Sequence, residues 1–305
     1  MTGLVITYAI EIIGETWFGI AMYSEVENKM TSAERVISYT KLPSEPGYSR
    51  KSLPPRGWPS HGAVSIQGLS YEGGPRVLKD VHFEVMPRQK IGIVGRTGAE
   101  KSSLVAALFR MPEPQGKVLI DGVDLGTLDI QAARRAMAVI TQDPVLFAAS
   151  LRKNLDPFDK FDDQAIWNAL EEVELKDKIR ELKRGLDFAL DESGMRFRIG
   201  ERQLLCLARA LLQRSKILIM DEATANVDFM TDSLIQQVIR EKFKDCTLLT
   251  IAHRLNTIMG YDKVLVLDQG HVVEYDTPRT LAGKQNGVCA RILRSHSYQD
   301  HINNL

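Results

Sequence analysis

The spacing of hydrophobic and polar positions divides the chain into four parts. Residues 1–39 begin with an apolar run long enough to span a membrane and continue as a charged amphipathic helix. Residues 40–62 are rich in proline, which removes backbone donors and favours an extended, exposed linker. Residues 63–295 alternate short apolar runs with helical periods, which predicts a layered α/β domain, and residues 296–305 form a polar tail.

The apolar start of the chain contains two carboxylates, Glu11 and Glu15, which lie four residues apart and so share one face of a helix. A carboxylate in the middle of a membrane costs about 2.5–3.5 kcal/mol on insertion scales, so this face would point into a helix bundle or an aqueous cavity. The pattern alone fits a buried helix of a soluble domain equally well. The position of the segment ahead of the charged helix, the linker and the α/β domain favours a membrane span.

Residues 95–103 read Gly-Arg-Thr-Gly-Ala-Glu-Lys-Ser-Ser, between an apolar, β-prone run at 90–94 and a helical run at 104–109. A strand, a glycine-rich turn and Lys-Ser at a helix start are the layout of a phosphate-binding loop. In such a loop backbone N–H groups bind phosphate oxygens, Lys101 reaches the outer phosphates, and the Ser102 hydroxyl ligates Mg²⁺. The predicted nucleotide-binding residues of the loop are Gly95, Arg96, Thr97, Gly98, Ala99, Glu100, Lys101, Ser102 and Ser103.

Glu100 departs from this motif, which asks for glycine immediately before the lysine. The glycine lets the backbone pass close to phosphate in a conformation that a side chain resists. At a separation of ~5 Å and an effective dielectric near 20, each pair of like charges costs about 3 kcal/mol, although a carboxylate in solvent is largely screened. The flanking runs favour a phosphate-binding loop over a glycine-rich turn without function. Whether the loop still works stays open.

Residues 216–222 form a strand-like run that ends in two carboxylates, Asp221 and Glu222. Ligands of α/β proteins bind at the carboxyl ends of strands. With a phosphate-binding loop upstream, Asp221 fits the carboxylate that holds Mg²⁺ through water, and Glu222 fits the general base for an attacking water. The structural alternative is an acidic cap at the start of the next helix.

Composition and charge narrow the class of protein. The chain has 305 residues, a net charge of zero and a pI near 7.0, so it carries no electrostatic footprint for nucleic acid. Its three cysteines are scattered and lack metal-ligand spacing, which favours reduced thiols of a cytosolic domain over a disulfide framework.

The order of several motifs resembles one protein family. The phosphate-binding loop is followed by Gln142 in Ile-Thr-Gln-Asp-Pro, by residues 197–203 at the start of an apolar helix, by the carboxylate pair at Asp221, and by His253 after a strand-like run. This order resembles an ATP-binding-cassette (ABC) domain. More closely, it resembles the C-terminal nucleotide-binding domain of the multidrug resistance-associated exporters, the C subfamily. The runs that carry the closer resemblance are 152–158, 221–228 and 250–258.

The resemblance implies roles for further residues. Tyr71 stands where an aromatic ring stacks on adenine, an interaction worth about 1–3 kcal/mol per base. Gln142 corresponds to the residue that touches Mg²⁺ and water and links the site to the membrane domain, and His253 to a histidine that contacts the γ-phosphate. Asp228 corresponds to a carboxylate that communicates across a dimer of such domains. The implied catalytic residues are therefore Glu222, His253 and Gln142, and the implied metal ligands are Ser102, Gln142 and Asp221.

The signature motif of the family, Ser-x-Gly-Gln, reads Arg198-Ile199-Gly200-Glu201 in this chain. In the family this loop meets the γ-phosphate of ATP held by a second domain, and Gly200 would allow the close approach. Arg198 would pair with phosphate as a cation but adds bulk, and Glu201 either adds negative charge or caps its own helix. We expect impaired rather than absent function at that half-site.

The resemblance implies a phosphate-loop core sheet with an antiparallel β subdomain and a helical subdomain, preceded by one membrane-type helix. The implied function is binding and hydrolysis of ATP, with ATP and Mg²⁺ as cofactors, coupled to efflux of organic anions or drugs. The implied partners are the first nucleotide-binding domain and the transmembrane domains of a full transporter. The implied location is the plasma membrane, with the nucleotide-binding domain on the cytoplasmic side.

Two alternatives remain at this stage. The first is a truncated, catalytically impaired nucleotide-binding or regulatory module, suggested by Glu100, Arg198 and Glu201 at phosphate-facing positions. The second is a soluble cassette ATPase outside transport, against which the span-like start and the proline-rich linker argue. With one nucleotide domain and at most one span, we expect the chain to be a fragment of a transporter that forms no translocation pathway alone.

Overall fold

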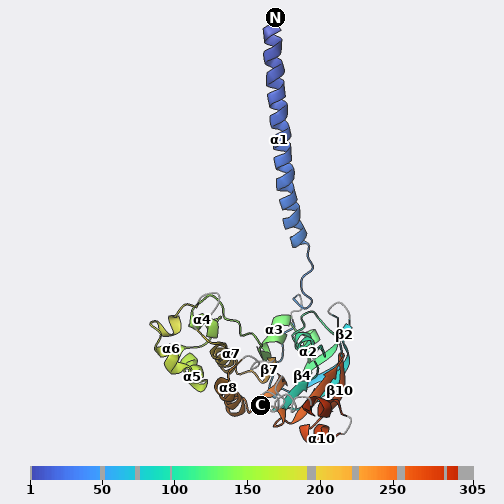
Figure 1. Ribbon diagram of the computed structural model, residues 1–305, viewed down its shortest axis with the longest axis vertical. Coiled ribbons are helices and arrows are strands. Elements are labelled where there is room, and N and C mark those ends of the chain that lie inside the picture. Colours follow the sequence, from blue (N-terminus) through green and yellow to red (C-terminus); the bar gives the residue numbers. More distant parts are fainter. Residues whose placement is uncertain are drawn as a thin grey trace. The chain divides into compact units, whose positions relative to one another are not determined.

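The computed structural model describes residues 2–48, 52–72, 76–96, 98–190, 197–221, 227–252, 258–284 and 287–294. The chain divides into two compact units, Met1–Glu45 and Pro46–Leu305 (Figure 1).

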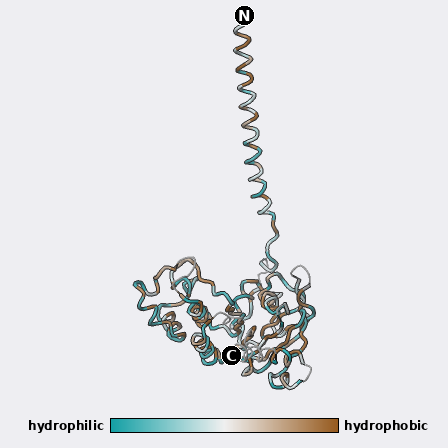
Figure 2. Tube along the Cα trace, in the orientation of Figure 1, coloured by the Kyte–Doolittle hydropathy of each residue, from teal (hydrophilic) through white to brown (hydrophobic). Residues whose placement is uncertain are grey.

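The first unit consists mainly of one helix, α1 (Thr2–Thr40), none of whose residues is buried. At 1.5 Å per residue its 39 residues extend for about 58 Å, well beyond the ~30 Å hydrocarbon core of a bilayer. Its N-terminal part is predominantly hydrophobic and its C-terminal part is more hydrophilic (Figure 2). In the hydrophilic part Lys29 pairs with Glu25 at 2.8 Å. Among the described residues, α1 is the helix long and apolar enough to cross a membrane.

The second unit is built around a mainly parallel sheet whose strand order is β10-β9-β3-β8-β7-β6. β3, β6, β7, β8 and β9 run parallel, and β10 joins the edge antiparallel to β9. The strand bounds are β3 (Lys90–Val94), β6 (Met137–Ile140), β7 (Ile217–Asp221), β8 (Thr247–Ile251), β9 (Lys263–Asp268) and β10 (His271–Asp276).

Strand β7 shows how this sheet is covered on both faces. Successive side chains of a strand point to opposite faces, and in β7 both sets are buried. Ile217 and Ile219 join the hydrophobic cluster that includes β3 and the second sheet, whereas Leu218 and Met220 join the cluster formed with the helical region. A continuous apolar run is what a parallel sheet between two layers requires.

The second sheet is antiparallel, with the strand order β2-β1-β4-β5. Its strands are β1 (Val64–Glu72), β2 (Arg76–Val85), β4 (Gln115–Ile120) and β5 (Val123–Asp124). Helix α2 (Lys101–Leu108) packs between the two sheets, since Leu104 and Leu108 share one core cluster with residues of both. A short 3₁₀ turn (Leu125–Thr127) and α3 (Ile130–Arg135) follow β5.

A helical region covers the other face of the main sheet (Figure 1). Three of its helices, α4, α5 and α8, begin after a side chain that accepts a backbone N–H, that of Ser150, Asp162 and Asp228 respectively, which stabilises the helix start. The helices are α4 (Leu151–Leu155), α5 (Asp163–Glu172), α6 (Lys176–Arg180), the 3₁₀ turn Gly185–Asp187, α7 (Ile199–Gln213) and α8 (Phe229–Lys242), and α10 (Pro278–Gly283) follows β10. The predicted α/β class, with a core sheet, an antiparallel β part and a helical part, is confirmed.

The segment that leads into β1 is fixed to the turn between β4 and β5. The Asp121 carboxylate accepts hydrogen bonds from the backbone N–H groups of Ser60, His61, Gly62 and Ala63, at 2.8–3.1 Å. Burial alone would raise the pKa of Asp121, but the four backbone donors outweigh it and hold the pKa below its ordinary value of 3.8. The end of the proline-rich segment is therefore part of the domain.

We predict that Asp121→Asn destabilises the chain by about 1–3 kcal/mol at neutral pH, because one acceptor oxygen is replaced by a donor that faces N–H groups. A lowered pKa in the folded state stabilises the fold above pH 3.8, and this contribution is lost as the pH falls further. The difference between the two proteins in urea unfolding should therefore shrink below that pH. Asp187→Asn, at an exposed residue, is the control, and a pH-independent difference would contradict this account.

Candidate functional site

The predicted phosphate-binding loop connects the carboxyl end of β3 to the start of α2. Gly95 leaves no room for a side chain, because a Cβ there would lie 2.5 Å from the Leu267 carbonyl oxygen of β9. Gly98 has φ +79°, in the left-handed region that favours glycine. Both glycines therefore have a structural reason to be glycine, and together they allow a tight turn against the sheet edge.

Lys101 begins α2 and folds its side chain back over the loop. Its ammonium group donates to the Gly95 carbonyl at 3.0 Å and to the Arg96 carbonyl at 3.3 Å. The backbone N–H groups at the start of a helix have no acceptor within the helix, and the helix dipole makes this end favourable for an anion. Lys101 thus places a positive charge beside the N–H groups of a helix start, an arrangement that favours binding of phosphate.

Ser102 and Asp221 lie far apart in the sequence but meet in the structure. The Ser102 hydroxyl is 3.5 Å from Oδ1 of Asp221, the last residue of β7. Strand pairing explains this, since Ile93 of β3 pairs with Ile251 of β8, and Ile251 pairs with Asp221. Mg²⁺ prefers oxygen ligands and usually keeps several water molecules in its coordination shell. The two side chains therefore present oxygen atoms of the kind that could hold Mg²⁺.

Glu100 adopts the backbone conformation that the motif reserves for glycine. Its φ of 67° and ψ of 34° are left-handed, a region that costs a non-glycine residue about 1–2 kcal/mol. Its carboxylate accepts a hydrogen bond of 2.5 Å from the Ser103 hydroxyl in the first turn of α2. Glu100 thus takes the conformation that glycine favours and places a carboxylate at the N-terminal end of the helix.

Gln142 is exposed, and its backbone is hydrogen-bonded by Gln203 of α7, a residue for which the sequence predicted no role. Gln203, only 1% exposed, donates from its side-chain amide to the carbonyls of Thr141 at 3.0 Å and Gln142 at 2.9 Å. The motif in residues 197–203 contains Gln203, but its contact depends on a partner 61 residues earlier in the chain. The sequence offered as a signal only a glutamine next to the apolar run of this helix.

At the start of α7, the two residues that depart from the family signature, Arg198 and Glu201, have definite contacts. The Glu201 carboxylate accepts the Arg198 backbone N–H at 3.0 Å and forms an ion pair with Lys178 of α6. Glu201 thus caps its own helix, one of the two outcomes expected. Arg198 is exposed and near Asp228, whose pKa is lowered first by the Thr231 backbone N–H and hydroxyl and also by the Arg198 charge.

Gly200 lies where the first turns of α7 and α8 meet. A Cβ at this position would lie 2.5 Å from Cγ2 of Thr231 and 3.1 Å from Cγ1 of Val227. The glycine therefore permits close helix contact, a structural role in addition to the one that the family resemblance implies.

Tyr71 lies in β1, with its ring in the core and 7% of its surface exposed. Its hydroxyl donates to the Met111 backbone carbonyl, and burial raises its pKa. The ring as placed presents little free surface to a base, so adenine stacking by Tyr71 stays a prediction that requires the ring to become exposed.

Three predicted site residues, Thr97, Glu222 and His253, lie outside the described residues. Of the others, the structure brings Lys101, Ser102 and Asp221 to one edge of the main sheet. The Gln142 backbone is hydrogen-bonded to Gln203 of α7, and Gly200 packs against Thr231 at the start of α8.

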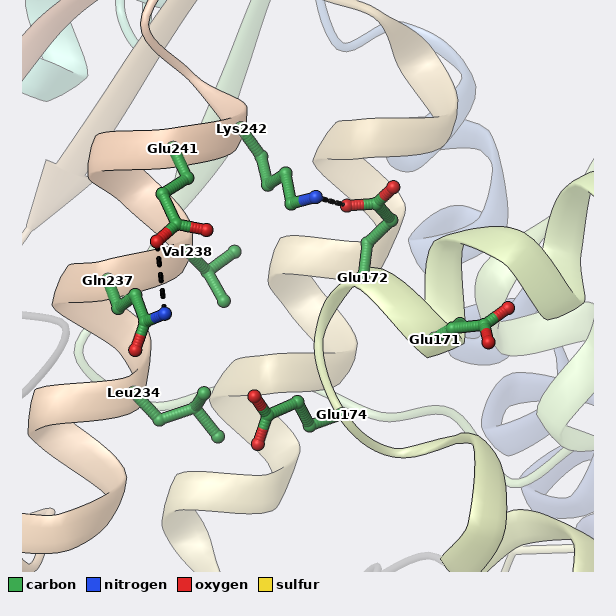
Figure 3. Close-up of a pocket in the computed structure, with 8 residues that line it drawn as sticks. All are labelled: Glu171, Glu172, Glu174, Leu234, Gln237, Val238, Glu241 and Lys242. Atoms are coloured by element: carbon green, nitrogen blue, oxygen red, sulfur yellow. Dashed lines mark hydrogen bonds and ion pairs between the residues drawn. The ribbon is translucent and has the colours of Figure 1, made fainter.

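A separate pocket of about 230 Å³ lies between α5 and α8. Figure 3 shows Lys242 of α8 reaching Glu172 of α5, with which it forms an ion pair, while Glu241 accepts from Gln237. The residues that line it are Glu171, Glu172, Glu174, Leu234, Gln237, Val238, Glu241 and Lys242. None of these is a predicted site residue, and four carboxylates around one lysine do not suit a phosphate.

Comparison with known proteins agrees with the motif order. The model of the ABC transporter family matches residues 78–225. ATP-binding cassette sub-family C member 4 of Mus musculus is 50% identical over 92% of the chain, and the Homo sapiens protein of that name is 49% identical over 96%. The fold matches a bacterial Atm1-family ABC exporter solved with ATP bound, with a TM-score of 0.80 and 27% identity over 90% of the chain.

The chain spans about a fifth of the length of these curated relatives, 21% and 22%, and 49% of the exporter chain. The similarity therefore concerns one part of longer proteins.

We predict that Gly200→Ala destabilises the chain by about 1–3 kcal/mol in urea unfolding, because the new methyl group overlaps Thr231. Adding Thr231→Ser removes the overlapping methyl but keeps the hydroxyl that donates to Asp228, so it should restore most of the loss. Gly260→Ala, at a glycine with open space around it, is the control. Equal effects of the two alanine substitutions would contradict the close contact.

Proposed function

Because the chain belongs to the ABC transporter family, we propose that residues 63–295 bind ATP with Mg²⁺ and hydrolyse it, as the C-terminal nucleotide-binding domain of a C-subfamily exporter. The observation that carries this proposal is the approach of Ser102 to Asp221 beside Lys101, since it joins the phosphate-binding and metal-binding motifs at one sheet edge.

The proposed site divides its work among three kinds of group. The first turn of α2 and Lys101 bind the phosphates, with Lys101 exchanging the Gly95 and Arg96 carbonyls for phosphate oxygens. Ser102 and Asp221 hold Mg²⁺, which when bound neutralises charge on the phosphates. Tyr71 is assigned to the adenine, for which its buried ring would have to become exposed.

We assign the remaining chemistry to Glu222, His253 and Gln142. Glu222 follows Asp221 directly and would accept a proton from the attacking water as general base. His253 would donate a hydrogen bond to the γ-phosphate, and Gln142 would orient water and touch Mg²⁺. Gln203 supports Gln142 by fixing the backbone of its loop to α7.

The assembly and its location belong to the same proposal. Helix α1 would be the last membrane span with its extension, and residues 40–62 the linker, whose last residues are held by Asp121. The predicted tail, residues 296–305, lies outside the described residues. The partners would be a first nucleotide-binding domain and transmembrane domains, with hydrolysis driving efflux of organic anions or drugs. This places the nucleotide-binding domain on the cytoplasmic side of the plasma membrane. Similarity to sub-family C proteins supports this assignment.

The alternative of a catalytically impaired module gains no support from the comparisons. Of the three altered residues on which it rests, Glu201 is engaged by its own helix and by Lys178. We therefore retain ATP hydrolysis as the proposed activity, with affinity modified by Glu100.

We predict that the full chain in detergent micelles binds mant-ATP in a Mg²⁺-dependent manner and releases phosphate. Lys101→Met should weaken binding roughly ten- to a hundredfold, since a hydrogen bond to a charged group is worth about 1.5–3 kcal/mol. Asp221→Asn should remove most of the Mg²⁺ dependence. Lys117→Met, at an exposed lysine of β4, is the matched control. Unchanged affinity in both site variants would exclude this nucleotide site.

A further inference from the structure

The phosphate-binding loop of this chain contains an anion of its own. The Glu100 carboxylate accepts the Ser103 hydroxyl at 2.5 Å, and Ser103 belongs to the first turn of α2. The carboxylate therefore lies at the helix end whose N–H groups and dipole favour an anion. The same end is where the proposed function places the phosphates of ATP.

The Ser103 hydroxyl can donate to the Glu100 carboxylate or to a phosphate but not to both, because it has a single hydrogen to donate. While that hydrogen is donated to Glu100, it is not available to a phosphate oxygen. A hydrogen bond of 2.5 Å to an ionised carboxylate is of the strong, charge-assisted kind, so an incoming phosphate must replace a good interaction.

The backbone keeps Glu100 in this position. Its left-handed conformation is one that non-glycine residues adopt rarely, and the Leu104 N–H bonds to the Glu100 carbonyl at 3.2 Å to start the helix. The Lys101 ammonium is engaged by the Gly95 and Arg96 carbonyls. The Glu100 carboxylate accepts the Ser103 hydroxyl but caps no backbone N–H of α2, so the hydroxyl is the donor that it takes from a phosphate.

We propose that Glu100 is an internal competitor of the nucleotide, with its carboxylate occupying the phosphate-binding end of α2 through the Ser103 hydroxyl. This inference rests on the proposed binding of ATP. In the native chain ATP gains the Ser103 hydroxyl only by displacing Glu100, so the hydroxyl contributes little net affinity. Without the carboxylate the same hydroxyl is free to bind phosphate and contributes fully.

A double-mutant cycle on the full chain in detergent micelles tests this competition, with mant-ATP and Mg²⁺ as the probe. Glu100→Gly should tighten binding roughly tenfold, because repulsion and competition both disappear. Ser103→Ala should change Kd by less than about twofold in the native background but weaken binding roughly tenfold in the Glu100→Gly background. Glu100→Gln, a weaker and uncharged acceptor, should fall between the native chain and Glu100→Gly.

Two further measurements separate competition from damage to the fold. Ser233→Ala removes an exposed helical hydroxyl from α8 and should leave Kd unchanged, and thermal unfolding should show every variant folded. Raising the ionic strength should reduce the difference in affinity between the native chain and Glu100→Gly, because screening weakens charge repulsion.

The outcomes distinguish this inference from the proposed function. If Ser103→Ala weakens binding by the same factor in both backgrounds, or more strongly in the native one, Glu100 does not compete through Ser103 and the inference is wrong. If Glu100→Gly is folded and binds no mant-ATP, the proposed nucleotide site itself is wrong and the inference is overturned with it.

Discussion

Parallel pairing of β3, β8 and β7 is the constraint on which the proposed site depends. It aligns Ile93, Ile251 and Asp221 across the sheet, so that the loop after β3 and the carboxylate at the end of β7 emerge at one edge. The 3.5 Å separation of Ser102 and Asp221 follows from this alignment. A shift of one residue in either pairing would turn Asp221 to the other face and separate its carboxylate from the Ser102 hydroxyl.

The same sheet also holds both ends of the altered loop. Gly95 is packed against the Leu267 carbonyl, and α2 is anchored in the core by its leucines, so both ends of the loop are fixed. Glu100 therefore adopts the left-handed conformation of the turn although it is not glycine. The conformational cost of replacing glycine therefore falls on Glu100 alone, and it is the negative charge of Glu100 that would affect a ligand.

Local sequence patterns predicted the α/β class, because apolar runs, glycine-rich turns and helix starts are determined by residues close together in the sequence. The Ser102–Asp221 approach was also predictable, since Asp221 ends one strand and Ser102 begins the helix that follows the loop after another. By contrast, the burial of Tyr71 and the Gln203 contact to Thr141 and Gln142 depend on packing between distant segments, which periodicity does not encode. Predicting the Ser103–Glu100 hydrogen bond would have required the backbone conformation at Glu100, which the sequence does not give once glycine is replaced.

The most direct test of the account is a crystal structure of the chain with Mn²⁺ and a non-hydrolysable ATP analogue, in which anomalous scattering locates the metal. The account predicts Mn²⁺ at about 2.1 Å from the Ser102 hydroxyl, with Asp221 reached through a metal-bound water and the phosphates at the N-terminus of α2. Metal and triphosphate bound away from these residues, or Ser102 and Asp221 on different sides of the domain, would contradict it.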